Sequence, residues 1–221
     1  MKILLFGATG MIGQGVLREA LLDPDTTKVV TVGRRPTGQS NPKLTELVSP
    51  DLTALSPLES QLVGFDACLF CLGVSALGMT EEAYTRVTYD LTMAVARTLL
   101  RTSPNLTFIY ISGAGTDSSE HGRMMWARVK GRTENALLSL PFRVAYMFRP
   151  GAIIPLHGIR SSTWWYNALY VGLRPLYPIL SRIAPNSMTT TERLGQAMLA
   201  VARSGYSTRI LETADINRVA S

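Results

Sequence analysis

Three glycines near the start of the chain, Gly7, Gly10 and Gly13, recur at every third position in the segment GATGMIG. A buried-strand pattern precedes them and a helical pattern follows, which is the setting of a dinucleotide-binding turn. Gly7 permits the tight turn, Gly10 lets the backbone approach a pyrophosphate, and Gly13 lets helix and strand pack closely. The helix offers unpaired N–H groups to the phosphates. The alternative is a merely tight strand–helix turn. We predict that the nucleotide site includes Gly7, Thr9, Gly10, Met11, Ile12 and Gly13.

An arginine pair follows about 20 residues later, in Gly33-Arg34-Arg35, as the dinucleotide fingerprint expects for its ribose-binding position. Proteins that bind NAD usually place an acidic residue there, which accepts a hydrogen bond from the ribose 2′-hydroxyl. Arginine cannot accept that bond, but it can hold a 2′-phosphate through charge-assisted hydrogen bonds. Arg34 and Arg35 therefore predict NADP(H) rather than NAD(H). The alternative is a solvated turn in which one arginine stacks on the adenine.

Short apolar runs alternate with helical segments, and these elements must position the loop and the arginine pair. The expected strands are Lys2–Phe6, Lys28–Val32, Leu44–Val48, Ala67–Leu72, Thr107–Ile111 and Arg143–Phe148. The expected helices are Met11–Leu22, Leu55–Leu62, Glu81–Arg101 (with Thr80 as N-cap) and Met124–Leu140. Continuous apolar strands separated by helices are typical of a parallel sheet covered on both faces. We predict an α/β fold with a Rossmann-like, doubly wound parallel sheet.

The pattern changes after Pro150. Residues Ser161–Arg182 are rich in aromatic residues and proline, and a helix over Glu192–Arg203 and a last strand over Arg209–Glu212 are expected. No internal repeat or flexible linker divides the chain. We predict a single domain over residues 1–221, in which about residues 151–221 contribute a small C-terminal substrate lobe.

Composition limits the classes of protein and partner. The 221 residues are 46% hydrophobic and 17% charged, which excludes a disordered chain. The net charge of +6 is uneven, because the stretch from Asn135 to Thr191 has five arginines and no acidic residue. That favours an anionic cofactor, substrate or surface, although an arginine-rich proteome would give the same bias. The arginines form no recognised reading motif, so no nucleic-acid partner is expected.

Cysteine, histidine and hydropathy patterns restrict location and metal binding. Cys68 and Cys71 are three apart in a strand, so they should face opposite sides of the sheet and stay reduced. Only His121 and His157 are present, so no metal site is predicted. No signal peptide precedes GATGMIG, and no apolar stretch is long enough for an integral membrane span. The expected location is cytoplasmic.

The segments GATGMIG, VGRR, SPDL, CLG, YISG, VKG and FRPG occur in this order along most of the chain. In this order they resemble the NAD(P)H-binding atypical and extended short-chain dehydrogenases, and they are similar to the NmrA-like and Tat-interacting oxidoreductase groups. The resemblance implies a reductase or epimerase-type oxidoreductase acting on an unknown carbonyl compound.

The resemblance also implies positions around the cofactor. Asp51 and Leu52 would lie at the adenine, with the Asp51 carboxylate accepting from its amino group; a helix-capping role is the alternative for Asp51. Gly73 would let the backbone approach the ligand. The positions implied near the nicotinamide and its ribose are Cys71, Leu72, Gly73, Lys130, Pro150 and Ile153.

The catalytic position departs from the family pattern. The family pairs a tyrosine that transfers the proton with a lysine one helical turn later, and a serine after the fifth strand polarises the carbonyl. Ser112 and Lys130 match the serine and the lysine, but Trp126 stands at the tyrosine position. An indole N–H only donates and does not titrate in water, so Trp126 cannot carry the proton. Lys130, on the same helical face, can still hold the ribose. The alternative is a packed tryptophan and an exposed surface lysine.

Three functions remain open. An oxidoreductase would need another acid, for which Tyr84, Tyr89 and His121 are candidates. A regulatory protein would sense NADPH without turnover. A third function is association with a membrane surface through Trp164–Leu180. A lid over a small-molecule substrate or a homodimer face is the favoured use of that segment, because prolines interrupt any long amphipathic helix.

Overall fold

A computed structural model describes residues 1–159 and 186–220. Within these residues, seven parallel strands form one sheet in the order β3-β2-β1-β4-β5-β6-β9. The strands are β1 (Lys2–Phe6), β2 (Lys28–Gly33), β3 (Leu44–Val48), β4 (Ala67–Phe70), β5 (Thr107–Ile111), β6 (Val144–Arg149) and β9 (Ile210–Glu212). The strand order changes direction between β1 and β4, which makes that pair the switch point of the sheet. The predicted α/β fold with a Rossmann-like, doubly wound sheet is confirmed.

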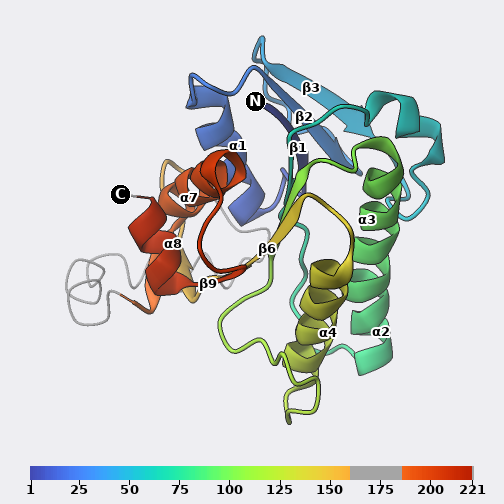
Figure 1. Cartoon of the computed structure of the whole chain (residues 1–221), viewed down its shortest axis with the longest axis vertical. Coiled ribbons are helices and arrows are strands. Elements are labelled where there is room, and N and C mark those ends of the chain that lie inside the picture. Colours follow the sequence, from blue (N-terminus) through green and yellow to red (C-terminus); the bar gives the residue numbers. More distant parts are fainter. Residues whose placement is uncertain (160–185, 221) are drawn as a thin grey trace.

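Helices cover both faces of the sheet (Figure 1). One face carries α1 (Met11–Leu22), α7 (Thr191–Ser204) and α8 (Thr213–Val219), and the other carries α3 (Leu91–Thr102) and α4 (Met125–Ser139). Because strand residues alternate between faces, Ile3 packs in the core under α1 and α7, while Leu4 packs in the core under α3 and α4. Two separate hydrophobic layers therefore hold the sheet in place.

The two cysteines lie in different layers. Cys68 belongs to the core beside α3 and α4, and Cys71 belongs to the core beside α1 and α7. Both are free thiols, and burial raises the pKa of each. The expectation that the two cysteines face opposite sides of the sheet is confirmed, and that they stay reduced remains a prediction.

Helices α1 and α7 cross in close contact. A Cβ atom added to Gly15 of α1 would lie 2.6 Å from Cβ of Thr191 and 2.9 Å from its carbonyl oxygen. A Cβ added to Gly195 of α7 would lie 2.7 Å from Cγ of Glu19. Glycine at these positions lets the C-terminal part of the chain pack directly on the first helix.

Three expected helix boundaries are corrected. The single helix expected over Glu81–Arg101 is α2 (Glu81–Thr85), a π-helical turn η2 (Arg86–Asp90) and α3, with Thr80 confirmed as the N-cap that accepts from the N–H of Ala83. A π turn absorbs an extra residue without ending the helix, so the apolar spacing does not reveal it. The helix expected over Leu55–Leu62 is the 3-10 turn η1 (Ser56–Gln61). Helix α4 begins one residue later than expected, because Met124 is its extended N-cap.

Three short elements were not expected from the sequence. Strands β7 (Ala152–Ile154) and β8 (Met188–Thr190) pair in parallel, and α8 follows β9 directly. Strands of three residues are too short to show alternation. Of the predicted lobe, residues 186–220 return to the main body through β8, α7 and β9, whereas Trp164–Leu180 lies outside the described residues. The lobe itself stays a prediction. Among described helices, none is long and apolar enough to cross a membrane.

Candidate cofactor and substrate site

The glycine loop connects β1 to α1 with little free space on its inner side. Gly7 has a φ of +84°, and a Cβ there would lie 2.7 Å from the carbonyl carbon of Cys71. A Cβ at Gly13 would lie 2.0 Å from the carbonyl oxygen of Gly7. At Gly10 the nearest atom would be that same oxygen, at 3.4 Å. The loop is therefore closed at Gly7 and Gly13 and has room at Gly10, where the sequence predicts the pyrophosphate.

The N-terminus of α1 begins at this loop. Gly10 is its N-cap and has an extended backbone, with φ −77° and ψ 163°. Within the described part of the chain, no side chain caps this end and the first turn holds no acidic residue. The Gln14 side-chain amide donates to the carbonyl of Thr9 at 3.0 Å, which braces the loop. Backbone N–H groups at an uncapped helix start favour an anion such as a phosphate.

The end of β4 lies against the glycine loop. A Cβ added to Gly7 would lie 2.8 Å from the backbone nitrogen of Leu72, so the two strand ends leave no space for a side chain between them. At Gly73, by contrast, an added Cβ would meet no described atom within 4 Å. Gly73 is exposed and offers an open backbone at the switch point of the sheet. This is where doubly wound folds bind their ligands.

Arg34 and Arg35 follow directly on β2. Both side chains are exposed, and neither guanidinium group has a hydrogen bond or ion pair with any residue that the structure describes. The N–H of Ser49 donates to the carbonyl of Gly33 at 2.9 Å, which fixes the strand end beneath them. Two unneutralised guanidinium groups at the end of the second strand suit a 2′-phosphate.

Asp51 and Leu52 have local roles. One carboxylate oxygen of Asp51 accepts from the hydroxyl of Thr53 at 2.7 Å and from its N–H at 2.8 Å. These bonds from Thr53 lower the pKa of Asp51. The side chain of Leu52 is buried in the core beside α3. Asp51 therefore stabilises a local turn and does not cap the 3-10 turn that follows, whose N-cap is Leu55, so the helix-capping alternative is not borne out. The adenine contact stays a prediction.

Ser112, Lys130 and Pro150 meet around Gly113. The Lys130 ammonium donates to the carbonyl oxygen of Ser112, and the N–H of Ala114 donates to the carbonyl of Pro150 at 2.9 Å. A Cβ at Gly113 would lie 3.9 Å from both Nζ of Lys130 and the Pro150 carbonyl oxygen. The hydroxyl of Ser112, however, is buried and donates to the carbonyl of Phe148 at 3.1 Å. The structure therefore brings Ser112, Lys130 and Pro150 together, as the resemblance implied. The Ser112 hydroxyl, however, is hydrogen-bonded to a backbone carbonyl.

Trp126 lies over the same loop. Its ring atom Cη2 is 3.5 Å from the position of a Cβ at Gly115, and the side chain is half-buried. The α4 helix and the loop are so close that a Cβ at Gly131 would lie 1.7 Å from the carbonyl oxygen of Asp117. The indole thus packs against the backbone that leads from Ser112 towards α4, one helical turn before Lys130.

Lys130 is a half-buried amine rather than an exposed surface lysine. Burial lowers its pKa from 10.5 to about 8, and the nearby Glu134 opposes that change by favouring the charged form. A group with this pKa is mainly protonated at pH 7 and still exchanges its proton near neutral pH. Lys130 is therefore a titratable group one helical turn after Trp126, which stands at the position of the family tyrosine.

The other candidate acids are held elsewhere by the described contacts. Tyr84 is buried, and burial raises its pKa. Tyr89 stacks with Arg132, whose guanidinium carbon lies 4.3 Å from the ring centroid. His121 is exposed. Ile153, which the resemblance placed near the nicotinamide, is buried in the core that also contains Cys71. No described contact joins Tyr84, Tyr89 or His121 to Lys130.

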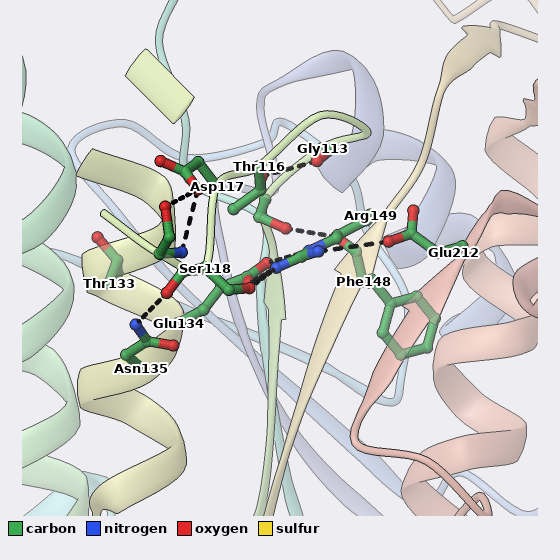
Figure 2. Close-up of polar contacts among 12 residues, drawn as sticks. Gly113, Thr116, Asp117, Ser118, Thr133, Glu134, Asn135, Phe148, Arg149 and Glu212 are labelled. Atoms are coloured by element: carbon green, nitrogen blue, oxygen red, sulfur yellow. Dashed lines mark hydrogen bonds and ion pairs between the residues drawn. The ribbon is translucent and has the colours of Figure 1, made fainter. Parts of the chain in front are cut away.

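The residues missed by sequence reasoning form an ion-pair network around Glu134 and Arg149 (Figure 2). Arg149 at the end of β6 donates through Nε to both oxygens of the fully buried Glu134, at 3.0 and 3.2 Å. The same guanidinium contacts Ser118 and, at 3.4 Å, Glu212. The available signal was the spacing of Glu134, four residues after Lys130, which places both on one helical face.

Comparison with solved structures defines the class of fold. A thiolation-reductase di-domain from an archaeal non-ribosomal peptide synthetase has a TM-score of 0.71 at 15% identity and covers 96% of this chain and 70% of that one. DesIV, a dTDP-glucose 4,6-dehydratase from Streptomyces venezuelae with NAD and TYD bound, gives 0.66 at 14% identity, covering 100% and 80%. A short-chain dehydrogenase family protein from Francisella tularensis gives 0.66 at 13%, covering 96% and 95%. The chain therefore has the Rossmann-like fold of these structures.

The sequence is also similar to curated fungal proteins named fmp52. The chain is 29% identical over 165 residues to the mitochondrial protein fmp52 of Emericella nidulans, which is 69% of this chain and 66% of that protein. It is 25% identical over 224 residues to fmp52-2 of Aspergillus oryzae, covering 97% and 95%. It spans slightly less than two thirds of the Emericella protein and of its Neurospora crassa counterpart. No family model matches the chain. The expected cytoplasmic location is contradicted, because these relatives are named as mitochondrial proteins.

Proposed function

We propose that the protein binds NADP(H) at the carboxyl ends of β1, β2 and β4. The observation that carries this proposal is the uncapped start of α1 behind the Gly7–Gly13 loop, together with the exposed guanidinium groups of Arg34 and Arg35, which have no partner among the described residues. The helix start suits the pyrophosphate, and the arginine pair suits a 2′-phosphate. NAD is bound in several structures of the same fold, including that of DesIV. The open backbone at Gly73 supports a nicotinamide ribose at the switch point.

We further propose that the bound nucleotide serves the reduction of a carbonyl group on a small molecule. The nicotinamide supplies the hydride when bound. Lys130, held at the Ser112 carbonyl, orients the ribose and exchanges a proton at Nζ near neutral pH. Ser112 polarises the substrate carbonyl once its hydroxyl turns away from Phe148.

A second function, NADPH sensing without turnover, is favoured by one specific observation. Trp126 replaces the family's proton-carrying tyrosine, and the hydroxyl of Ser112 is hydrogen-bonded to the backbone. Such a protein would keep the cofactor contacts and lack the acid. Binding and turnover must therefore be tested separately.

The cofactor is tested with the arginine pair. We expect the native protein to bind NADPH more tightly than NADH. The double variant Arg34→Ala, Arg35→Ala should bind NADPH roughly tenfold to a hundredfold more weakly than the native protein. That range corresponds to about 1.5–3 kcal/mol for hydrogen bonds to a charged group. NADH binding should be unchanged. The measurement is titration calorimetry, with Arg209→Ala as a control in another exposed arginine. A native preference for NADH would contradict the assignment.

Turnover is tested with Trp126→Tyr. We expect NADPH oxidation over a panel of carbonyl compounds to appear or to rise in this variant, because a titratable hydroxyl would then stand one turn before Lys130. Trp126→Phe is the matched control, which changes the packing without supplying a proton. If the tyrosine variant binds NADPH and stays inactive, the missing tyrosine is not what limits turnover, and the sensing function gains support.

A further inference from the structure

Glu134 is a buried carboxylate with two cations in its surroundings. Lys130 lies one turn earlier on α4, and Arg149 reaches across from the end of β6. The other titratable groups nearby are Tyr110 of β5, whose pKa is raised by burial and further by Tyr84 and Glu134, and Glu212 of β9 beyond Arg149. The negative charge of Glu134 therefore acts on Lys130, Tyr110 and Arg149.

A buried carboxylate needs a partner, because its charge is costly away from water. Arg149 supplies one with the fixed fork of its guanidinium, which contacts both oxygens of Glu134. Lysine is a single point charge on a flexible stem and satisfies two oxygens less well. With Glu134 occupied by Arg149, the Lys130 ammonium is directed instead at the Ser112 carbonyl, beside Gly113. Figure 2 shows the Arg149–Glu134 pair.

We propose that Arg149 is a positioning residue for Lys130: by holding both oxygens of Glu134, it keeps the Lys130 ammonium at the Ser112 carbonyl instead of on the neighbouring carboxylate. Arg149 also contacts Ser118 in the loop after β5 and Glu212 in β9. It therefore connects the orientation of Lys130 to the loop that carries Ser112 and to the edge strand of the sheet. What Lys130 then binds rests on the proposed function, but its orientation does not.

The test follows the Lys130 amine directly. The chain has only four lysines, Lys2, Lys28, Lys43 and Lys130, so NMR of protein labelled with ¹³C at lysine Cε resolves each titration. We expect one resonance, assigned with Lys130→Arg, to titrate near pH 8 in the native protein. In Arg149→Met its midpoint should rise by at least one pH unit, because the unpaired Glu134 captures the ammonium. In the double variant with Glu134→Gln it should return to the native value or below.

Two further variants keep the proposal falsifiable. Glu212→Gln removes another contact of Arg149 and should leave the Lys130 titration unchanged. If Arg149→Met does not fold, Arg149→Lys retains the charge without the fork and should give a smaller upward change. A folded Arg149 variant, checked by amide spectra, in which Lys130 titrates as in the native protein would overturn the positioning role.

NADPH affinity separates this proposal from the proposed function. If both hold, Arg149→Met weakens NADPH binding while Glu212→Gln does not. If the native protein does not bind NADPH, the proposed function fails, and the Lys130 titrations still decide the role of Arg149.

Discussion

At the scale of single residues, Gly13 and Gly73 lack a side chain for different reasons. A Cβ at Gly13 would overlap the Gly7 carbonyl, whereas a Cβ at Gly73 would meet no described atom. The folded chain itself requires glycine at position 13, whereas the described part of the chain leaves open space around Gly73.

Alanine substitutions at Gly13 and Gly73 should therefore have different effects. Gly13→Ala should lower the free energy of unfolding by roughly 1–3 kcal/mol, the usual cost of overpacking, because its neighbour is backbone that cannot turn aside. Gly73→Ala should leave stability nearly unchanged and weaken NADPH binding. Urea denaturation and calorimetric titration measure the two effects. A Gly73→Ala variant with native affinity would argue against a cofactor at the end of β4.

The sequence predicted which backbone segments meet at the site, but it did not predict the hydrogen-bond partner of every side chain. Ser112 and Lys130 do meet, as the YISG and VKG segments suggested. The bond from the Ser112 hydroxyl to Phe148 joins residues 36 apart in sequence, and no local pattern reports such a partner. The Arg149–Glu134 pair was missed for the same reason.

At the scale of elements, the crossing of α1 and α7 determines how the C-terminal part of the chain attaches. The two glycines at the crossing face different neighbours: Gly15 faces the backbone and Cβ of Thr191, and Gly195 faces the side chain of Glu19. A long side chain can move to another rotamer, but backbone cannot.

We therefore expect Gly15→Ala to destabilise the protein more than Gly195→Ala, by about 1 kcal/mol or more. Comparing the urea midpoints of both variants with the native protein checks this order. Both substitutions add the same methyl group to a helical glycine, so each serves as the control for the other. Equal losses would show that the helices separate slightly instead of clashing locally.

Elements with a long, regular pattern were predictable, and short or irregular ones were not. The strands β1, β3 and β5 and the helix α1 match their expected bounds. In β1 and β5 nearly every residue is buried, which makes the apolar run easy to delimit. The η2 turn continues the helical direction, so the spacing of apolar residues changes too little to be noticed. Strands β7 and β8 exist only because they pair with each other across residues far apart in the sequence.

At the scale of the whole molecule, the stability of the fold at low pH depends on carboxylates that accept hydrogen bonds. Asp117 accepts from the hydroxyl and N–H of Ser119 and from the N–H of Gly122, and these bonds lower its pKa. Glu192 has a lowered pKa chiefly through His157. Such groups stabilise the fold above their unfolded pKa values, near 4, and this stabilisation is lost as pH falls through the lower folded values.

Stability should therefore decline as pH falls from about 4.5 towards 2.5, and Asp117→Asn should decline less steeply over that range. Asparagine cannot gain a proton there, so its contribution does not titrate. Thermal unfolding at closely spaced pH values gives both slopes, with Asp51→Asn as a comparison in a similar exposed turn. Parallel slopes for Asp117→Asn and the native protein would assign the acid sensitivity to other carboxylates.

The placement of Cys68 and Cys71 on opposite faces of one sheet gives the two hydrophobic layers separate chemical reporters. Neither thiol can react with a labelling reagent while its own layer is closed, because burial both shields it and keeps it protonated. Labelling followed by peptide mass measurement would therefore time the opening of each layer independently. Equal rates would mean that the sheet and its helices open together, and unequal rates would identify the half of the molecule that loosens first.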